Sequence, residues 1–383
     1  MAARDIIIPA DVGAVVIVDL DAITENYRLI QATCPGADVG AAVKADAYGL
    51  GVGPVTATLS DAGCTTFFVA TPAEGLQLRG SNANAEIVVL NGPEPESITT
   101  LLDGRLTPTL NSLTQIETWS ATRADTSMDA WLHVDTGMNR LGLDLRELET
   151  LITEPSRLDE MRISAVLSHL ACADTPDHPM NAAQRDSFAA LCERLTPIIG
   201  AFRTSLANSP GVFLGPAYHF DLVRPGASLY GIRPNAERPN PMKQVVEIYT
   251  KILQVRDIDT PMTVGYGAAH QVTGTRRIAT LAAGYADGYP RAAANMAGNT
   301  EGNSMCAFID GQPTPLAGRI SMDLITIDVT DLPAALCRPG QTVELLGPNV
   351  TPDDLADAAG TIAYEVLSRL GSRLHLEYRS GTS

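Results

Sequence analysis

The stretch TTFFVATPAEGLQLRGSNANAEIVVL (65–90) decides the fold. Two short apolar runs, TTFFVA (65–70) and AEIVVL (85–90), have the length and composition of buried strands. Between them, TPAEGLQLR (71–79) spaces its apolar residues by three and four, as an amphipathic helix does. A strand, a helix and a second strand in this order predict two parallel strands joined by a helical crossover.

The same alternation extends outward in both directions, from about residue 39 to 231. Further amphipathic stretches at 144–152 and 181–195 supply crossover helices. Six more strand candidates complete the pattern: DVGAAVK (38–44), TPTLN (107–111), AWLHVD (130–135), ISAVLSHL (163–170), RTSLAN (203–208) and ASLYG (227–231), the last of them preceded by LVR (222–224). Eight strands predict a (β/α)8 barrel of the TIM type, although a doubly wound sheet would give a similar alternation.

The rhythm changes after a proline-rich hinge, RPNAERPNPM (233–242). Strand-like runs such as VVEIYTKILQV and DLITIDV then follow one another, separated by glycine and proline turns. One late amphipathic stretch (351–370) supplies one or two helices. We therefore predict an α/β barrel over 11–240 and a C-terminal, mainly-β domain over 241–383, to which residues 1–10 also belong.

Composition and charge exclude several classes of protein. The 383 residues carry a net charge of −17 and no basic run, so nucleic acid is not expected as a partner. No apolar run approaches the roughly 20 residues that span a bilayer, and the N-terminus lacks the pattern of an export signal, so we expect a cytoplasmic protein without a membrane partner. The six cysteines are scattered and the six histidines lack ligand spacing, which argues against disulfides and against a metal site.

Candidate functional residues follow the predicted strands, where the active sites of such barrels lie. Lys44 closes the first strand, and a lysine there loses solvation unless its amine is paired or used covalently, for example as a Schiff base. A lysine that merely snorkels at the barrel mouth is the commoner arrangement for such a residue taken alone. The other candidates are Arg140, His169, the pair Asn208-Ser209, and Arg224 with Pro225-Gly226. The small residues after the late strands suit a phosphate site or are simple turns, and Arg224 could tune a cofactor or pair with Asp221.

Taken together, the segments resemble alanine racemases in order and along nearly the whole chain. AAVKADAYGLG (41–51) resembles the lysine motif that binds pyridoxal 5'-phosphate (PLP). The later matching segments are HVDTGMNRLGL (133–143), SHLACAD (168–174), ANSPG (207–211), VRPGASLYG (223–231), VGYGAAH (264–270), GYADGYPR (284–291) and GRISMDLITIDV (318–329). The resemblance implies a PLP enzyme that interconverts L- and D-alanine, supplies D-alanine for peptidoglycan, and forms a homodimer with shared active sites.

The resemblance also implies two bases. Lys44 would hold PLP and remove the α-proton of the D-enantiomer, and Tyr266 of the second subunit would serve the L-enantiomer from the opposite face. A racemase needs such a pair because the proton leaves one face of a planar carbanion and returns to the other. His169 and Arg224 correspond to the hydrogen-bonded chain that supports the tyrosine.

Cofactor and substrate contacts follow from the same resemblance. Arg224, permanently charged, would face the pyridine nitrogen and keep it unprotonated, which weakens the electron sink and favours return of the proton to the α-carbon. The phosphate would be held by Tyr48, Ser209, Tyr364 and backbone groups near Gly226, with Asn208 and His169 also beside the cofactor. Arg140 would contact both cofactor and substrate, Met322 the substrate, and Tyr285 and Arg319 would line its access path.

One position departs from the family pattern. Many relatives have a lysine, often carbamylated, where this chain has His133, so Arg140 must be held by an anion or by the imidazole. Two alternative functions remain at this stage: a racemase of broader specificity, for example for serine, and a non-catalytic PLP-binding barrel. A decarboxylase of related architecture is a further possibility, although the segments containing Tyr266 and Arg140 fit racemases better.

Overall fold

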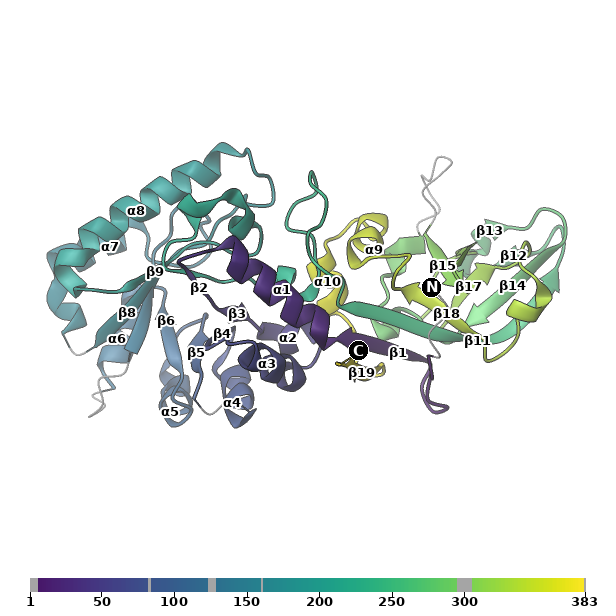
Figure 1. The fold of residues 1–383 in the computed structure, drawn as a ribbon, viewed down its shortest axis with the longest axis horizontal. Helices are drawn as coiled ribbons and strands as arrows, with labels where there is room; N and C mark the ends of the chain where they lie inside the picture. The colour runs from purple at the N-terminus through teal and green to yellow at the C-terminus, as the bar shows by residue number, and fades with distance from the viewer. Residues whose placement is uncertain (1–5, 82–83, 123–128, 160, 295–304, 382–383) are drawn as a thin grey trace. The chain divides into compact units, whose positions relative to one another are not determined.

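The computed structural model describes residues 6–81, 84–122, 129–159, 161–294 and 305–381. Its contacts divide the chain into two units, Ile23–Lys243 and Met1–Ala22 with Gln244–Ser383. Figure 1 shows the first as strands surrounded by helices and the second as mainly strands. Within the described residues, no helix is long and apolar enough to cross a membrane.

The first unit is a closed ring of parallel strands. The strands are β2 (Asp38–Val39), β3 (Ala41–Ala42), β4 (Thr66–Val69), β5 (Glu86–Val89), β6 (Thr107–Leu110), β7 (Asp129–His133), β8 (Arg162–Leu167), β9 (Arg203–Ser205) and β10 (Leu222–Val223). β3 to β9 pair in sequence order as one parallel sheet, and β10 pairs with β2. Backbone hydrogen bonds from Asp221 to Thr204 and from Arg224 to Ala207 join β10 to the β9 side, which closes the ring. Because β2 and β3 form one strand broken at Gly40, the ring has the eight positions of the predicted barrel, and the fold class is confirmed.

The last barrel strand lies earlier than predicted. ASLYG (227–231) is not a strand: residues Ala227–Tyr230 form a short 3-10 helix, and the strand is Leu222–Val223. The ring can accept only a segment whose N–H and C=O groups reach both neighbours, and residues 221–225 do so on the β9 and β2–β3 sides. Tyr230 is instead buried and donates its hydroxyl to the Ala42 carbonyl.

Helices cover the outside of this ring, with α4 and α7 close to the predicted positions and α8 longer at both ends. The helices are α1 (Leu20–Thr33), α3 (Val52–Asp61), α4 (Pro72–Ser81), α5 (Ile98–Asp103), α6 (Leu113–Ser120), α7 (Leu145–Thr153) and α8 (Pro179–Ile199). The interior is packed rather than open, because Phe68, Val88, Trp131 and Leu167 fill it. Near the strands' N-terminal ends, Glu86 accepts hydrogen bonds from Trp131 and Arg203 at 2.7–3.0 Å.

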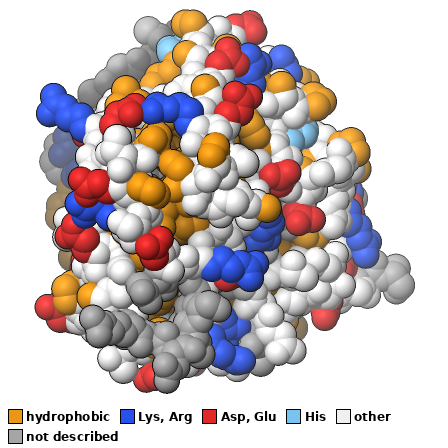
Figure 2. Space-filling view, turned by 90° about the vertical axis from the view of Figure 1, so that its left-hand side faces the viewer, with side chains coloured by type: hydrophobic (Ala, Val, Ile, Leu, Met, Phe, Trp, Pro, Cys, Tyr) orange, Lys and Arg blue, Asp and Glu red, His pale blue; other side chains and the backbone are white. Residues whose placement is uncertain are grey.

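The surface of the barrel unit mixes charges of both signs. Figure 2 shows acidic and basic side chains interspersed on one face, with hydrophobic side chains visible between them. With a net charge of −17 over the whole sequence, this face presents no continuous cationic field to a polyanion.

The second unit is built on an eight-stranded sheet. Its strands are β1 (Ala14–Asp19), β11 (Val246–Ile258), β14 (Arg276–Leu281), β15 (Cys306–Ile309), β16 (Gln312–Pro315), β17 (Ile325–Asp328), β18 (Thr342–Leu346) and β19 (His375–Arg379), and a separate pair is β12 (Thr263–Val264) with β13 (His270–Gln271). The late amphipathic stretch forms α9 (Pro352–Ala359) and α10 (Ala363–Ser368). A mainly-β C-terminal unit is therefore confirmed.

The N-terminal residues differ from the predicted boundaries. We placed residues 11–22 in the barrel, but β1 pairs antiparallel with β11 and parallel with β19, so this segment lies in the β unit. The reason is its fully apolar run, AVVIV, which is buried on both faces as a central strand requires. Residues 1–10 were expected to belong to the β domain: residues 6–10 are grouped with it, and residues 1–5 lie outside the described residues.

Candidate functional site

Lys44 begins an unusual left-handed turn. β3 ends at Ala42, two residues earlier than the predicted strand, and the four residues Ala45–Tyr48 then have φ between +53° and +59°. The amide of Ala47 donates to the carbonyl of Val43 at 2.9 Å and closes the turn. For residues other than glycine, this conformation costs about 1–2 kcal/mol each. Such strain is retained where surrounding contacts hold it, and it turns the chain sharply just after Lys44.

The environment of Lys44 weakens the protonated form of its amine. Burial lowers the pKa of Lys44, and the positive charge of Arg140 lowers it further, while Glu74 offsets part of the shift. A lysine with a depressed pKa supplies more of the free amine that can attack a carbonyl compound. The snorkelling alternative predicts a solvated ammonium with an ordinary pKa, so the structure favours a reactive amine.

His169 and Arg224 adjoin each other beside this lysine. The Arg224 guanidinium is buried and donates to the Ser205 hydroxyl at 2.6 Å and to the Ser168 carbonyl at 2.5 Å. Its Nη2 lies 3.5 Å from His169 Nδ1, and Asn208 Nδ2 lies 3.4 Å from Nε2. Burial and then the charge of Arg224 hold the pKa of His169 well below its usual value, and burial lowers that of Arg224 to about 10. The ring is therefore neutral and the guanidinium carries the charge.

A group of hydroxyls and backbone N–H groups lies in the loops after β9 and β10. The Ser209 hydroxyl accepts from the Gly226 N–H at 2.9 Å and from the Ser228 N–H at 3.1 Å. A methyl group added at Gly226 would lie 2.4 Å from the Tyr48 hydroxyl oxygen, so glycine permits the approach of that tyrosine. The buried Ser228 hydroxyl has no hydrogen-bond partner among the described residues. This cradle of small donors suits a phosphate.

His133 is oriented by Asn111, the residue that follows β6. Its Nδ1 lies 2.8 Å from Asn111 Oδ1, and the Asn111 amide donates to the Leu90 carbonyl and to Gln115 Oε1. Because that amide group already acts as a donor, His133 Nδ1 carries the proton and its Nε2 is an acceptor. Burial, with the charge of Arg224 second, lowers the pKa of His133 to about 4, so the ring is neutral.

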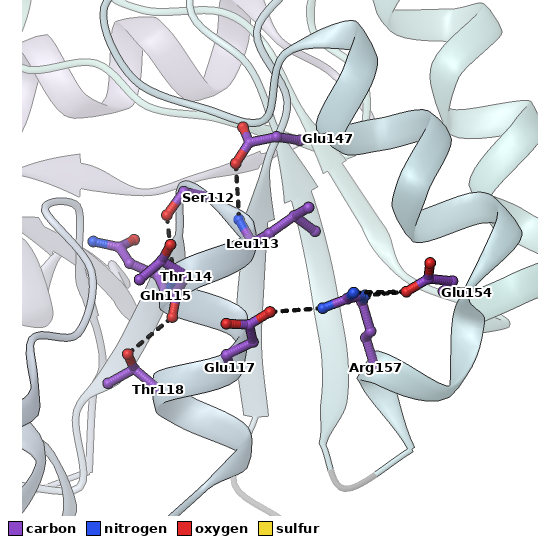
Figure 3. Close-up of polar contacts among 9 residues, drawn as sticks. All are labelled: Ser112, Leu113, Thr114, Gln115, Glu117, Thr118, Glu147, Glu154 and Arg157. Atoms are coloured by element: carbon purple, nitrogen blue, oxygen red, sulfur yellow. Dashed lines mark hydrogen bonds and ion pairs between the residues drawn. The ribbon is translucent and has the colours of Figure 1, made fainter.

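The first turn of α6, which holds Gln115, is itself anchored to α7, as Figure 3 shows. Ser112 caps the helix by accepting from the Gln115 N–H, and Glu147 on α7 accepts from the Leu113 N–H at 3.0 Å. Farther along, Arg157 bridges Glu117 and Glu154. The side chains that orient His133 are therefore supported by a tied pair of helices.

Arg140 lies on the loop that packs against His133. The carboxylate of Asp135 accepts three backbone N–H groups of residues 137–139, which fixes this loop. A methyl group at Gly142 would lie 3.0 Å from the His133 ring, so the imidazole contacts the same loop. Arg140 is exposed, and its charge lowers the pKa of Lys44, His133 and His169.

The second unit contains the five remaining candidates. Tyr266 is 70% exposed on a turn between β12 and β13, and a methyl group at Gly267 in that turn would lie 3.2 Å from the Arg319 guanidinium. Tyr285 and Met322 lie on paired segments, since the Ala286 N–H donates to the Met322 carbonyl at 2.9 Å. Tyr364 lies half-buried on α10. A cavity of about 340 Å³ lies between the Tyr285 segment and α10.

The barrel-unit residues fit PLP. PLP needs an amine for its aldehyde, donors for its phosphate and a partner for its ring nitrogen. Lys44, the Ser209–Gly226 cradle with its unpartnered Ser228 hydroxyl, and buried Arg224 offer these in the loops after strands of one barrel. No group of three His, Cys, Asp or Glu side chains that could hold a metal ion occurs among the described residues.

Together, the closed barrel, the half-buried Lys44 at its mouth, the small donors near Ser209 and the added β unit define a two-domain barrel protein with a site that suits PLP. Comparisons with known proteins make this specific. The family model "Alanine racemase, N-terminal domain" matches residues 18–234, and "Alanine racemase, C-terminal domain" matches residues 245–378. The chain belongs to the alanine racemase family.

Similar proteins cover almost the full chain. An alanine racemase of Rhodospirillum rubrum is 47% identical over 95% of this chain and 96% of its own length. The solved structure of alanine racemase from Bartonella henselae with covalently bound pyridoxal phosphate has a TM-score of 0.88 and 36% identity, covering 97% of this chain and 100% of that one. Biosynthetic alanine racemase from Pseudomonas aeruginosa has a TM-score of 0.87 and 34% identity, over 96% and 99% of the two chains. The resemblance read from the motifs is confirmed.

Several residues that contact or adjoin the candidate site residues were not predicted from sequence. Ser205 and Ser228 both lie within runs predicted as strands, RTSLAN and ASLYG, so no signal marks them as site residues. Glu74 stands three residues after Thr71, a spacing that indicates a helix-capping pair but not the contact that Glu74 makes with the turn after Lys44. Asn111 closes a predicted strand and could have been noticed as a polar residue at the barrel's functional end.

Proposed function

We propose that this chain is a PLP-dependent racemase that interconverts L- and D-alanine. The observation that carries the proposal is the half-buried Lys44, with its lowered pKa, in one barrel mouth with the His169–Arg224 pair and the Ser209–Gly226 cradle. The alanine racemases to which the chain is similar, one of them named as carrying covalently bound pyridoxal phosphate, support the cofactor and substrate.

The residues of the barrel unit bind and orient the cofactor. The Lys44 amine would hold the cofactor through its aldehyde. The Ser209 hydroxyl, which accepts from the Gly226 N–H, and the Tyr48 hydroxyl would hold the phosphate. Arg224, a permanent donor, would face the ring nitrogen and keep it unprotonated. When bound, PLP stabilises the negative charge that develops at the α-carbon as its proton leaves. Asn208 and His169 would line the cofactor, and the resemblance assigns a further phosphate contact to Tyr364.

Two groups move the proton. Lys44 Nζ takes or returns it on one face of the α-carbon, and the Tyr266 hydroxyl of a second copy does so on the other. The 70% exposure of Tyr266, with Met262 and Met322 each 54% exposed, supports a partner that covers this surface. Arg140 and Met322 would contact the substrate, and Tyr285 and Arg319 would line its access path. We therefore propose a cytoplasmic homodimer with shared sites.

The test is to incubate the purified protein with single L-amino acids and follow the loss of optical rotation. Borohydride, which fixes a carbonyl cofactor irreversibly to the amine that holds it, should label Lys44 and abolish turnover. Only three lysines occur in the sequence, so peptide mass spectrometry distinguishes Lys44 from Lys243 and Lys251. Racemisation at the wild-type rate by Lys44→Ala would refute the proposal. Equal rates with serine and alanine would replace it by a broad-specificity racemase.

The two-base part has its own test. Tyr266→Phe should slow both directions while leaving the cofactor bound, because one face loses its proton carrier. Unchanged turnover in both directions would remove Tyr266 from the mechanism. Relatives named as biosynthetic and as catabolic are equally similar to this chain, at 43% identity, so the comparisons do not separate the two roles. A growth experiment tests the supply of D-alanine for peptidoglycan, because a chain with this role should rescue a strain that requires D-alanine.

A further inference from the structure

Glu74 contacts two backbone segments that meet beside Lys44. It lies in the first turn of α4 and is half-buried. Its Oε1 accepts from the Ala45 N–H at 2.9 Å, and its Oε2 accepts from the Ala70 N–H at 2.7 Å and the Thr71 N–H at 3.3 Å. One carboxylate thus ties the residue after Lys44 to the end of the neighbouring strand β4.

The tied residue is the first of the left-handed turn. Ala45–Tyr48 all have positive φ, a conformation that L-residues leave readily unless contacts hold it. Two further contacts hold the far side: the Asp46 carboxylate accepts from the Val52 N–H at 2.7 Å, and Ala47 bonds to Val43. On the Lys44 side, Glu74 provides the contact between the turn and the loop of another strand.

Glu74 also supplies charge of the opposite sign. The positive charge of Arg140 adds to burial in lowering the pKa of Lys44. The charge of Lys44 in turn contributes to the lowered pKa of His169, which is neutral. Among the described residues, Glu74 is the acidic group whose charge raises the pKa of Lys44 and so offsets part of this lowering. Tether and charge therefore reside in one side chain.

We propose that Glu74 is a positioning residue for Lys44, holding the strained turn so that the amine is presented to the cofactor in one direction. The proposal rests on the proposed function, in which Lys44 binds PLP. It assigns to Glu74 a role beyond capping α4.

Two conservative variants separate the tether from the charge. In Glu74→Gln the amide oxygen can satisfy the two N–H groups at 70 and 71, but its NH2 group then faces the Ala45 N–H, so tether and charge are both lost. Glu74→Asp keeps the charge but its shorter side chain cannot bridge both segments. Thr71→Ala removes the α4 cap that the Glu74 N–H uses, at 3.3 Å, and leaves the carboxylate in place. Glu96→Gln, at an exposed position, is the matched control for loss of charge.

The first readout is the pH dependence of Lys44 labelling by an amine reagent in the full-length protein freed of cofactor, resolved by mass spectrometry. Lys243, paired with Glu25, and Lys251 serve as references within the same chain. We expect the Glu74→Gln profile of Lys44 to move to lower pH by about half a unit or more, and that of Glu74→Asp to stay near wild type. The second readout is the PLP dissociation constant, which both variants should raise about tenfold.

The proposal is overturned if both Glu74 variants match Glu96→Gln in both readouts, or if Thr71→Ala reproduces the loss of PLP affinity. Should either Glu74 variant unfold, judged by circular dichroism, the other decides. Failure of the proposed function looks different: the wild type itself would then take up no PLP at Lys44, while the labelling profiles would still report whether Glu74 acts on the lysine.

Discussion

Gly226→Ala tests the phosphate cradle through a steric conflict with Tyr48. The φ angle of Gly226 is −129°, outside the positive range that favours glycine, and the substitution adds one methyl group. That methyl would lie 2.4 Å from the Tyr48 hydroxyl oxygen and 3.1 Å from the Ala42 side chain. With ordinary contacts at about 3.5 Å, the Tyr48 hydroxyl must withdraw by roughly 1 Å.

Overpacking of this kind costs about 1–3 kcal/mol, which corresponds to a fall of roughly 2–12 °C in the unfolding midpoint. Displacement of the tyrosine should also raise the PLP dissociation constant by about 5- to 100-fold. Differential scanning calorimetry and a spectroscopic PLP titration measure the two effects. Gly53→Ala is the control, because a methyl there meets nothing within 4 Å and lies in helix α3, where alanine is favoured.

A second substitution makes the prediction specific. Tyr48→Phe removes the oxygen that clashes, so Gly226→Ala should cost less stability in the Tyr48→Phe background than in the wild type. Relief should be partial, since the ring carbon that bears the hydroxyl would still lie 3.1 Å from the new methyl group. An unchanged midpoint for Gly226→Ala, or costs that simply add in the double variant, would refute the reasoning.

Three further predictions follow from contacts and charges. Burial lowers the pKa of His133 to about 4 from its usual 6.5, so the stability that its neutral ring contributes above pH 6.5 is lost as pH falls through 4. The unfolding free energy of His133→Asn should therefore fall less steeply between pH 6.5 and 4 than that of the wild type. Parallel urea-denaturation profiles for the two proteins would contradict the shift. Ser209→Ala removes the acceptor of two buried N–H groups, so it should lower the free energy of unfolding by about 1–3 kcal/mol and weaken PLP binding. PLP binding equal to that of the wild type would show that Ser209 does not belong to the cradle. Asp287→Ala leaves the Gly284 N–H unpaired and should lower the unfolding midpoint more than Asp287→Asn, which still accepts; identical midpoints would show that this bond is not stabilising.

The periodicity of the sequence was enough to predict the barrel but not its closing strand. The first seven strand positions follow from apolar runs between helices, because each run is long enough to be recognised. The closing strand is two residues long, and the apolar run after it, ASLYG, has the better strand composition. Hydrogen bonds to both ring neighbours decide between them, and these depend on segments distant in sequence.

Sequence also predicted some features of the candidate site and not others. Residue types after strands predicted Lys44, His169, Arg224 and Ser209, which the structure brings into one barrel mouth. The roles of Tyr266 and Tyr364 came from resemblance and stay predictions. The neutral state of His133 could not be read from sequence, because it depends on burial and on which atom of Asn111 faces the ring.

The left-handed turn after Lys44 inverts a familiar rule of protein engineering. In most settings an alanine-to-glycine change loosens a protein, but at Ala45 the present residue has the unfavourable handedness and glycine would adopt the observed angles freely. A D-alanine introduced there by chemical synthesis would match the local geometry and also restrict the unfolded chain. Mirror-image building blocks could thus reinforce the segment that presents the reactive lysine, in an enzyme family whose substrates are themselves a mirror-image pair.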